Sequence, residues 1–550
     1  MRGGAEVIAL LRRHAGLVLL LALAAPALAA FAWQRSIATI GDDSVTYLLL
    51  ARHIAPGTPG IIERWVGLRG NFPPLFPLLL ALTGGAYDLL VAHLVVAAFA
   101  VLALLAVYAY ALQRLESRAG ALAITTLFLL TPNAWVSMKG ILTEPMFLVV
   151  SVAALAWYAR RLEGRPGGAR DWLIFGVLLA CAYLTRAAGV ALLMAYAAHA
   201  ALRALGKRSS ASWRLLLPMV PVVALVGLWL AWRPMTGEDA YGKTTHEMIA
   251  VWIAEPFPTL RVAAPRLLDG WIASFLAQSG VGTVARTLFA VLGTFALAGT
   301  LRAVRANRLD GWYVLASVAI TFGWVFGEDN TRRLLYPVVP LLMIHGAELA
   351  VALASRISAV RLRRLSLAAL AALPALLCLP AAVVFAGKAL ERGPMAPGAR
   401  HALADCVDLY TTIGLQAARV EAAYSLATIE GLESIAEATP PGARVMWMRP
   451  EYVAVLGHRE GVPFLYSWDE RRFARELLDQ RVDYLVVSAV YKTDDENRYG
   501  EPAKVYPHVT EYTQPALRVR NVVTGADGFR LLRVDRDAVE RFLASPPAPR

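Results

Sequence analysis

Apolar stretches of about 20 residues recur along the chain up to about residue 390, and short basic clusters separate them. A stretch of this length crosses the hydrocarbon core of a bilayer as one helix. Charged residues make up only 17% of the 550 residues, against about 25% in ordinary soluble domains. A soluble, disordered or fibrous chain is therefore excluded. The pattern predicts a mainly α-helical, polytopic transmembrane bundle.

The apolar stretches predict about eleven spans. The first, Leu17–Trp33, is interpreted as an uncleaved span, with a signal peptide as the alternative. The boundary at Arg186 is the weakest, because one bent helix there would invert every later span. The other spans are expected at Leu89–Leu112, Ala121–Met138, Pro145–Tyr158, Trp172–Thr185, Gly189–Leu205, Leu215–Trp232, Val281–Leu301, Trp312–Phe326, Leu334–Ala354 and Leu365–Ala386.

Basic residues concentrate in every second connection between the predicted spans, which is the positive-inside pattern. This pattern accounts for the net charge of +13, so the charge indicates no nucleic acid partner. With a cytoplasmic N-terminus, an odd number of spans places the C-terminal segment on the outer side. Two predicted outer connections are long, Gln34–Pro74 and Arg233–Gly280.

Charge returns from about Lys388, where short apolar runs alternate with polar segments. We expect a transmembrane domain over residues 1–387 and a soluble extracytoplasmic α/β domain over 388–550. The latter shows no phosphate loop, metal-ligand spacing or nucleophile elbow. Its predicted elements are helices at Ala402–Ala438 and Asp469–Asp479 and strands at Arg444–Trp447, Val462–Tyr466, Tyr484–Val490 and Phe529–Val534.

An acidic segment follows the first span directly. Helical spacing places Asp43, Tyr47 and Ala51 on one face, at i, i+4 and i+8. The apolar residues between them let such a helix lie along the membrane surface, where a carboxylate can act as a base on a lipid-linked substrate. The alternative is an ordinary helix N-cap at Asp42 or Asp43, which stabilises a helix by about 1 kcal/mol.

Further charged residues flank apolar segments on the predicted outer side. Glu144 directly precedes Pro145, and it either complements the helix dipole or faces a cavity. Arg186, Arg332 and Arg333 suit a phosphate group, because guanidinium forms bidentate hydrogen bonds with it, although snorkelling to the interface is the alternative for each. Together these residues indicate a site that holds an anionic lipid phosphate beside a general base.

In this order along the chain, the motifs resemble the GT-C superfamily of integral-membrane glycosyltransferases, which includes protein O-mannosyltransferases and lipid A aminoarabinose transferases. The resemblance covers about the first 390 residues. The motifs that carry it are Asp42-Asp43 with Tyr47 and Ala51, Phe72-Pro73-Pro74-Leu75, Thr143-Glu144-Pro145, Leu184-Thr185-Arg186, and Arg333 with Pro337 and Pro340.

The resemblance implies inverting transfer of a sugar from a polyprenyl-phosphate donor on the outer face of a bacterial cytoplasmic membrane. Asp43 matches the family's catalytic aspartate, with Asp42 as the fallback, and Glu144 would orient the acceptor or a metal. The residues expected to bind the donor phosphate are Arg333, Arg332, Arg186, Lys139 and Arg69, and those expected to position substrate are Tyr47, Tyr336 and His53.

Two positions depart from the family pattern. Phe72 stands where relatives often carry Lys or His before Pro-Pro, so another cation must supply that phosphate contact, with Arg64, Arg69 and Lys139 as candidates. Ser44 replaces an acidic residue that often follows the catalytic aspartate, which argues against metal binding by that motif. No cofactor is established, and a divalent metal is left open.

The expected partners are a polyprenyl-phosphate-linked sugar, membrane lipids and an envelope acceptor, which is a lipid, glycan or protein. Two other function classes stay open. A transporter or flippase fits the number of spans, but ionisable residues cluster at the outer edge rather than in mid-span. A non-catalytic assembly protein would use Asp43 and Glu144 only as helix caps. The sugar and the acceptor are not determined by the sequence.

Overall fold

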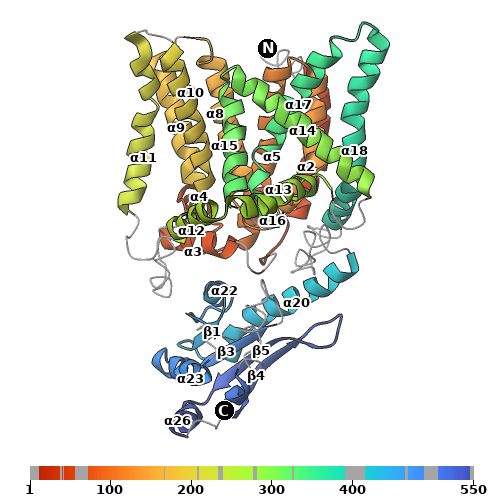
Figure 1. Cartoon of the computed structure of the whole chain (residues 1–550). Helices are drawn as coiled ribbons and strands as arrows, with labels where there is room; N and C mark the ends of the chain where they lie inside the picture. Colours follow the sequence, from red (N-terminus) through yellow and green to blue (C-terminus); the bar gives the residue numbers. More distant parts are fainter. Residues whose placement is uncertain are drawn as a thin grey trace, which may run out of the picture.

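The structure, a computed structural model, describes residues 12–37, 40, 43–55, 72–165, 167–206, 210–232, 240–276, 282–324, 328–390, 415–464, 469–488 and 506–545. Helices make up the first of its two parts, and a five-stranded sheet with flanking helices makes up the second (Figure 1). The start of the first described helix, α2, and the sheet lie at opposite ends of the helix bundle. The mainly helical class with a small C-terminal sheet is therefore confirmed.

The helix bundle is that of a multi-pass membrane protein. Among the described residues, five helices are long and apolar enough to cross a bilayer: Leu89–Leu115, Ala187–Leu205, Trp213–Trp232, Thr283–Arg305 and Val360–Gly387. The number of eleven spans stays a prediction. The long bundle helices are α2 (Ala15–Phe31), α5 (Leu89–Leu115), α6 (Arg118–Leu130), α8 (Glu144–Arg161), α9 (Ala169–Thr185), α10 (Val190–Gly206), α11 (Met219–Trp232), α14 (Thr283–Arg305), α15 (Leu309–Trp324), α17 (Val339–Ala354) and α18 (Val360–Leu390).

The chain reverses at Arg186, so the single bent helix considered above is not formed. Helix α9 ends at Thr185, Arg186 has an extended backbone, and the short helix η2 (Ala187–Gly189) leads into α10. A Cβ atom on Gly189 would lie 2.6 Å from the Tyr183 Cα atom, so only glycine allows the chain to fold back this closely. The helices α9 and α10 consequently lie side by side (Figure 1).

The predicted span Leu334–Ala354 is wrong as a continuous helix. Helix α16 (Glu328–Leu335) ends just inside the predicted span, and the next helix, α17, starts at Val339. Pro337 lacks the N–H that an uninterrupted helix would need, whereas Pro340 sits in the first turn of α17, where no N–H is needed. The break places α16 across the end of the bundle.

A further set of helices lies at the end of the bundle that faces the sheet (Figure 1). They are α3 (Ser44–Ile54), α4 (Leu75–Thr83), α7 (Pro132–Val136), α12 (Ala240–Ala254), α13 (Pro256–Ala273) and α16. Pro73 and Pro74 directly precede α4, as expected for a helix that starts after an irregular loop. Of the charged residues that the sequence singles out, Asp43 directly precedes α3, and Arg332 and Arg333 lie on α16.

The C-terminal sheet unit, defined here as residues 415–545, has the strand order β2-β1-β3-β5-β4. Strands β2, β1 and β3 are parallel, and β5 and β4 extend the sheet in antiparallel fashion. The strands are β1 (Arg444–Trp447), β2 (Glu460–Pro463), β3 (Tyr484–Ser488), β4 (Thr513–Arg520) and β5 (Asp527–Val534), and the helices are α20 (Leu415–Glu433), α21 (Ile435–Ala438), α22 (Pro450–Leu456), α23 (Glu470–Asp479), η6 (Pro507–Glu511) and α26 (Arg536–Ala544).

Most predicted elements of this unit are confirmed, including β1 and the helix that ends at Asp479. Strand β4 was not predicted, because it is an edge strand that pairs on one side only and carries Pro515 and mostly exposed side chains.

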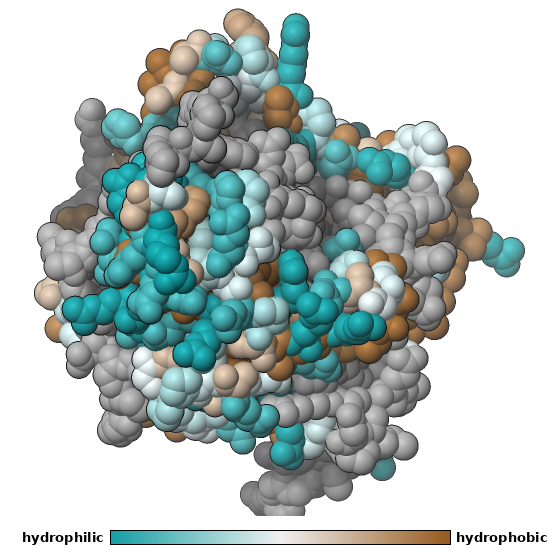
Figure 2. All heavy atoms as spheres, turned by 90° about the horizontal axis from the view of Figure 1, so that it is seen from below, coloured by the Kyte–Doolittle hydropathy of each residue, from teal (hydrophilic) through white to brown (hydrophobic). Residues whose placement is uncertain are grey.

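Seen from the end at which the sheet unit lies, the described surface is hydrophilic over much of its centre, whereas hydrophobic atoms gather at the margins (Figure 2). This hydrophilic surface is typical of a part that is exposed to water, whereas the helix bundle has an apolar surface.

A buried charged network lies at the other end of the bundle. Asp310 is fully buried and accepts hydrogen bonds from Tyr110 at 2.8 Å and Arg308 at 2.5 Å. The Arg114 Nε atom lies 3.2 Å from the same carboxylate, and the His345 Nε2 atom lies 3.3 Å from it. A charge in this environment is tolerated only when it is paired. The network therefore joins α5, α15 and α17.

Replacing Asp310 with alanine is expected to lower the free energy of unfolding by about 3 kcal/mol, because Arg114 and Arg308 would lose a buried counter-charge. Chemical denaturation of the purified protein in detergent measures this. The matched control is Asp269→Ala, since Asp269 is 37% exposed and its pair with Arg286 is worth less than about 1 kcal/mol. Equal losses in the two variants would contradict a stabilising role for the network.

Candidate active site

The guanidinium of Arg333 joins two carboxylates from distant parts of the chain. Its Nη2 atom donates a hydrogen bond of 2.6 Å to the Asp43 Oδ2 atom, and its Nε atom donates to the Glu144 Oε1 atom. Burial alone would lower the pKa of Arg333, but the carboxylates of Glu144 and Asp43 raise it well above its ordinary value. Arg333 is therefore a fixed positive charge between two acids.

Asp43 occupies the N-cap position of α3, but its side chain makes no capping hydrogen bond. The carboxylate is turned to Arg333 instead and is 33% exposed. The alternative that Asp43 serves only as a helix cap is thus wrong. An acid that is partly exposed and bound on one side by a cation is placed to meet a substrate.

Glu144 begins α8 and is only 1% exposed. Its Oε1 atom also lies 2.8 Å from the Nη1 atom of Arg186, which donates a further hydrogen bond of 3.1 Å to the Thr143 hydroxyl. The Glu144 Oε2 atom is buried and has no hydrogen-bond partner among the described residues. Glu144 therefore complements the helix dipole and also faces the two arginines.

Helix α16, which carries Arg333, is held closely against α13 and α7. A Cβ atom on Gly270 of α13 would lie 2.3 Å from the Thr331 Cγ2 atom, so the contact requires glycine. The Asn133 side chain donates a hydrogen bond of 3.1 Å to the Arg332 carbonyl oxygen. These two contacts fix the place from which the Arg333 side chain reaches the carboxylates.

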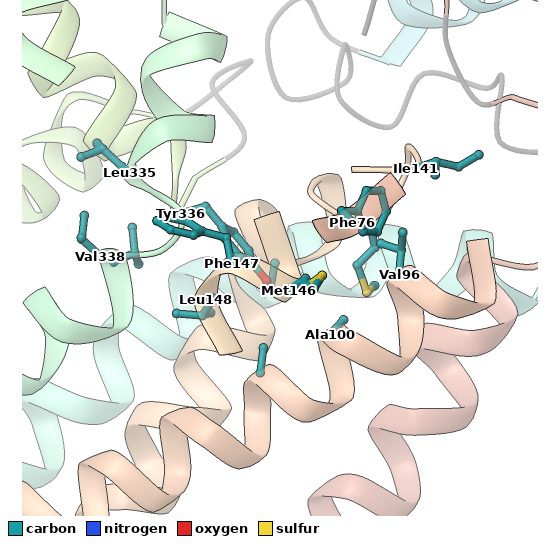
Figure 3. Close-up of a cluster of buried hydrophobic side chains, with 14 of the residues drawn as sticks. Phe76, Val96, Ala100, Ile141, Met146, Phe147, Leu148, Leu335, Tyr336 and Val338 are labelled. Carbon is teal, nitrogen blue, oxygen red and sulfur yellow. The ribbon is translucent and has the colours of Figure 1, made fainter. Parts of the chain in front are cut away.

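Aromatic side chains line the apolar side of the site. The Tyr47 ring packs edge-on against Phe72 at 5.4 Å and Phe76 at 5.3 Å between ring centroids. Burial raises the pKa of Tyr47, whose hydroxyl lies 3.4 Å from the Thr143 hydroxyl. The side chains of Tyr336 and Phe147 lie together in the neighbouring cluster (Figure 3). Phe72, for which the resemblance implied Lys or His in many relatives, thus packs against Tyr47.

The other expected site residues divide into three groups. Lys139 and Arg332 are buried, and Lys139 lies in the loop between α7 and α8. His53 lies at the other end of α3 from Asp43, with its ring centroid 6.4 Å from that of Trp232. Asp42, Arg64 and Arg69 lie outside the described residues.

Sequence reasoning did not assign roles to Thr143, Asn133 and Gly270. Thr143 was visible in the Thr-Glu-Pro motif, whereas a lone Asn or Gly gives no signal before the helices are packed together.

Among the described residues, no group of three or more His, Cys, Asp or Glu side chains is arranged to hold a metal ion.

No family model and no curated protein matches the chain. Among solved structures, the chain is similar to ArnT from Cupriavidus metallidurans bound to undecaprenyl phosphate, with a TM-score of 0.51 and 16% identity over 97% of this chain and 99% of that one. It is also similar to the Archaeoglobus fulgidus oligosaccharyltransferase in the apo form, with a TM-score of 0.50 and 14% identity over 94% of this chain and 74% of that one.

At these identities, the two structures show the fold that the chain shares with them. The expected resemblance is therefore confirmed at the level of the fold. Sequence identities of 16% and below leave the reaction, the substrates and the site residues to be argued from the side chains of this chain.

Replacing Gly270 with valine is expected to force α13 and α16 apart and to lower the free energy of unfolding by about 1–3 kcal/mol. Denaturation in detergent measures the change. Gly227→Val is the matched control, because a Cβ atom on Gly227 would meet nothing within 4 Å. A Gly270→Val variant as stable as Gly227→Val would show that the packing of α16 tolerates a side chain there.

Proposed function

We propose that the chain is a glycosyltransferase that moves a sugar from a polyprenyl-phosphate donor to a cell-envelope acceptor on the outer face of a bacterial cytoplasmic membrane. The observation that carries the proposal is the pairing of a partly exposed carboxylate, Asp43, with Arg333 at one end of a membrane bundle. Such a site offers a base beside a cation that can bind phosphate, at one end of the bundle. The GT-C fold supports the same reaction class.

In the proposed reaction, the acceptor hydroxyl oxygen attacks the anomeric carbon of the donor sugar from the face opposite the phosphate. The new carbon–oxygen bond forms as the bond to the phosphate oxygen breaks, so the configuration inverts. Asp43 accepts the proton of the acceptor hydroxyl. The polyprenyl phosphate leaves with the bonding electron pair, and negative charge builds up on its oxygen.

Arg333 and Arg186 are proposed to neutralise that charge. Their guanidinium groups both lie against Glu144 Oε1, so one buried carboxylate holds two cations side by side. Charge-assisted bonds from such preorganised donors are worth most in a site shielded from water. Lys139, Arg332 and Arg69 are proposed as further phosphate contacts, and Tyr47, Tyr336 and His53 as groups that position the substrate.

The membrane placement completes the proposal. The basic clusters support a cytoplasmic N-terminus, and with about eleven spans the site and the 388–550 domain are proposed to lie outside. Polyprenyl-phosphate sugars are proposed as donors because the similar ArnT structure is bound to undecaprenyl phosphate. Asp42 is the fallback for the base.

Asp43→Asn is expected to lower the turnover of labelled sugar from a panel of short-chain polyprenyl-phosphate sugars at least about 100-fold, because an amide does not accept the proton. Asp269→Asn is the matched control, since Asp269 is 37% exposed and also pairs with one arginine at 2.7 Å. Full transfer by a folded Asp43→Asn variant would refute Asp43 as the base. Lipid scrambling in liposomes, with no transfer by wild type from any donor, would favour a flippase.

Arg186→Gln is expected to raise the KM for the donor about tenfold or more, because one of the two proposed phosphate contacts is lost. Steady-state kinetics with varied donor concentration measure this. Arg286→Gln is the control, since Arg286 pairs with Asp269 and lies outside the site. An unchanged donor KM in Arg186→Gln would remove Arg186 from the proposed phosphate site.

A further inference from the structure

The C-terminal sheet unit contacts the connection that leads from α2 to α3. The Ser36 hydroxyl donates a hydrogen bond of 2.7 Å to the Glu433 Oε1 atom at the end of α20, which is 397 residues further along the chain. In the same region, α22 packs against α3, directly on the side of the bundle that faces the sheet (Figure 1). The sheet unit thus touches both α3 and the segment before it.

The segment around Ser36 is held from both sides. The Ser36 carbonyl oxygen lies 2.9 Å from the His93 Nε2 atom of α5, and the Gln34 side chain donates a hydrogen bond of 2.9 Å to the Ile37 carbonyl oxygen. Ser36 and Gln34 are both buried. Ser36 is therefore a fixed point between the membrane bundle and α20, seven residues before Asp43.

Helix α3 depends on such external support. It has only 11 residues, and a helix of this length is marginal in isolation. Its apolar residues Val45, Leu48 and Leu49 are buried in the same hydrophobic cluster as Tyr452 and Val453 of α22. The core that fixes α3 is thus continuous with one of the two hydrophobic clusters of the sheet unit, and the direction of Asp43 at the start of α3 depends on both units.

We propose that the C-terminal sheet unit positions the base: the Ser36–Glu433 hydrogen bond and the packing of α22 hold α3 so that Asp43 faces the substrate. Ser36 and Glu433 are positioning residues, since their described hydrogen bonds do not include the residues of the proposed site. The site residues are Asp43, Glu144, Arg186 and Arg333. The proposal rests on the proposed function and assigns the sheet unit a role in the chemical step rather than in donor binding.

The kinetic test uses Ser36→Ala, Glu433→Ala, the double variant and Glu433→Gln in the full-length protein. Each alanine variant is expected to lower kcat about 10- to 100-fold with the donor KM unchanged, because a misplaced base slows the chemical step. The double variant is expected to be no slower than either single variant, because all three lose the same contact. Glu433→Gln is expected to retain most activity, because its amide oxygen still accepts from Ser36.

The matched control is Glu421→Ala, which changes an exposed glutamate on the same helix α20. It is expected to behave as wild type. Additive losses in the double variant, a raised donor KM with unchanged kcat, or no loss in either alanine variant would overturn the positioning role.

Hydrogen exchange gives a second readout that needs no enzymatic activity. The amides of residues 43–55 are expected to exchange about tenfold faster in Ser36→Ala and Glu433→Ala than in wild type, Glu433→Gln and Glu421→Ala. Unchanged exchange in the alanine variants would overturn the proposal even if transfer by wild type is observed. Faster exchange without transfer from any donor would instead refute the proposed function and leave the support of α3 by the sheet unit in place.

Discussion

The fold at the sheet-facing end of the bundle depends on one guanidinium group shared by two carboxylates. Arg333 comes from α16, Asp43 from the start of α3 and Glu144 from the start of α8. An unpaired charge costs free energy at the edge of a membrane. The packing of these three elements therefore depends on the contact of the guanidinium with both carboxylates. The break between α16 and α17 and the close contact at Gly270 serve this convergence, because they bring Arg333 across the bundle end.

The two charged clusters of the bundle differ in how far their carboxylates are buried. This difference distinguishes a cluster that stabilises the fold from one that can bind a substrate. In the network around Asp310, the carboxylate is fully buried and bound by Tyr110 and Arg308. At the sheet-facing end of the bundle, Asp43 is 33% exposed and the Glu144 Oε2 atom has no hydrogen-bond partner among the described residues. The first cluster is buried and is assigned a role in stabilising the bundle, whereas the partial exposure of Asp43 fits the second cluster to meet a substrate.

The long apolar helices and the strands β1 and β3 were predictable, because hydrophobic length and periodicity are local properties of the sequence. The order of the motifs along the chain led us to expect that Asp43, Glu144 and two arginines would lie close together. In the structure, Arg333 contacts both carboxylates, and Arg186 contacts Glu144. The continuous helix expected at Leu334–Ala354 failed because the prediction counted apolar length and did not weigh Pro337.

Other features arise only from packing and were missed for that reason. In the sequence, Asp310 looks like an ordinary residue between two predicted spans, and its partners on α5 and α17 appear only once the helices are packed. The hydrogen bond between Ser36 and Glu433 joins residues 397 positions apart, and no local pattern predicts such a contact. Strand β4 is an edge strand whose alternation is weakened by Pro515.

The most direct measurement is a structure of the protein bound to a non-hydrolysable polyprenyl-phosphonate sugar. If the shared guanidinium marks a site for transfer, the phosphonate will lie within hydrogen-bond distance of Arg333 and Arg186, and the anomeric carbon will face Asp43 across space for an acceptor hydroxyl. A phosphonate bound away from both arginines, with the contacts of Arg333 to Asp43 and Glu144 intact, would contradict the proposed site.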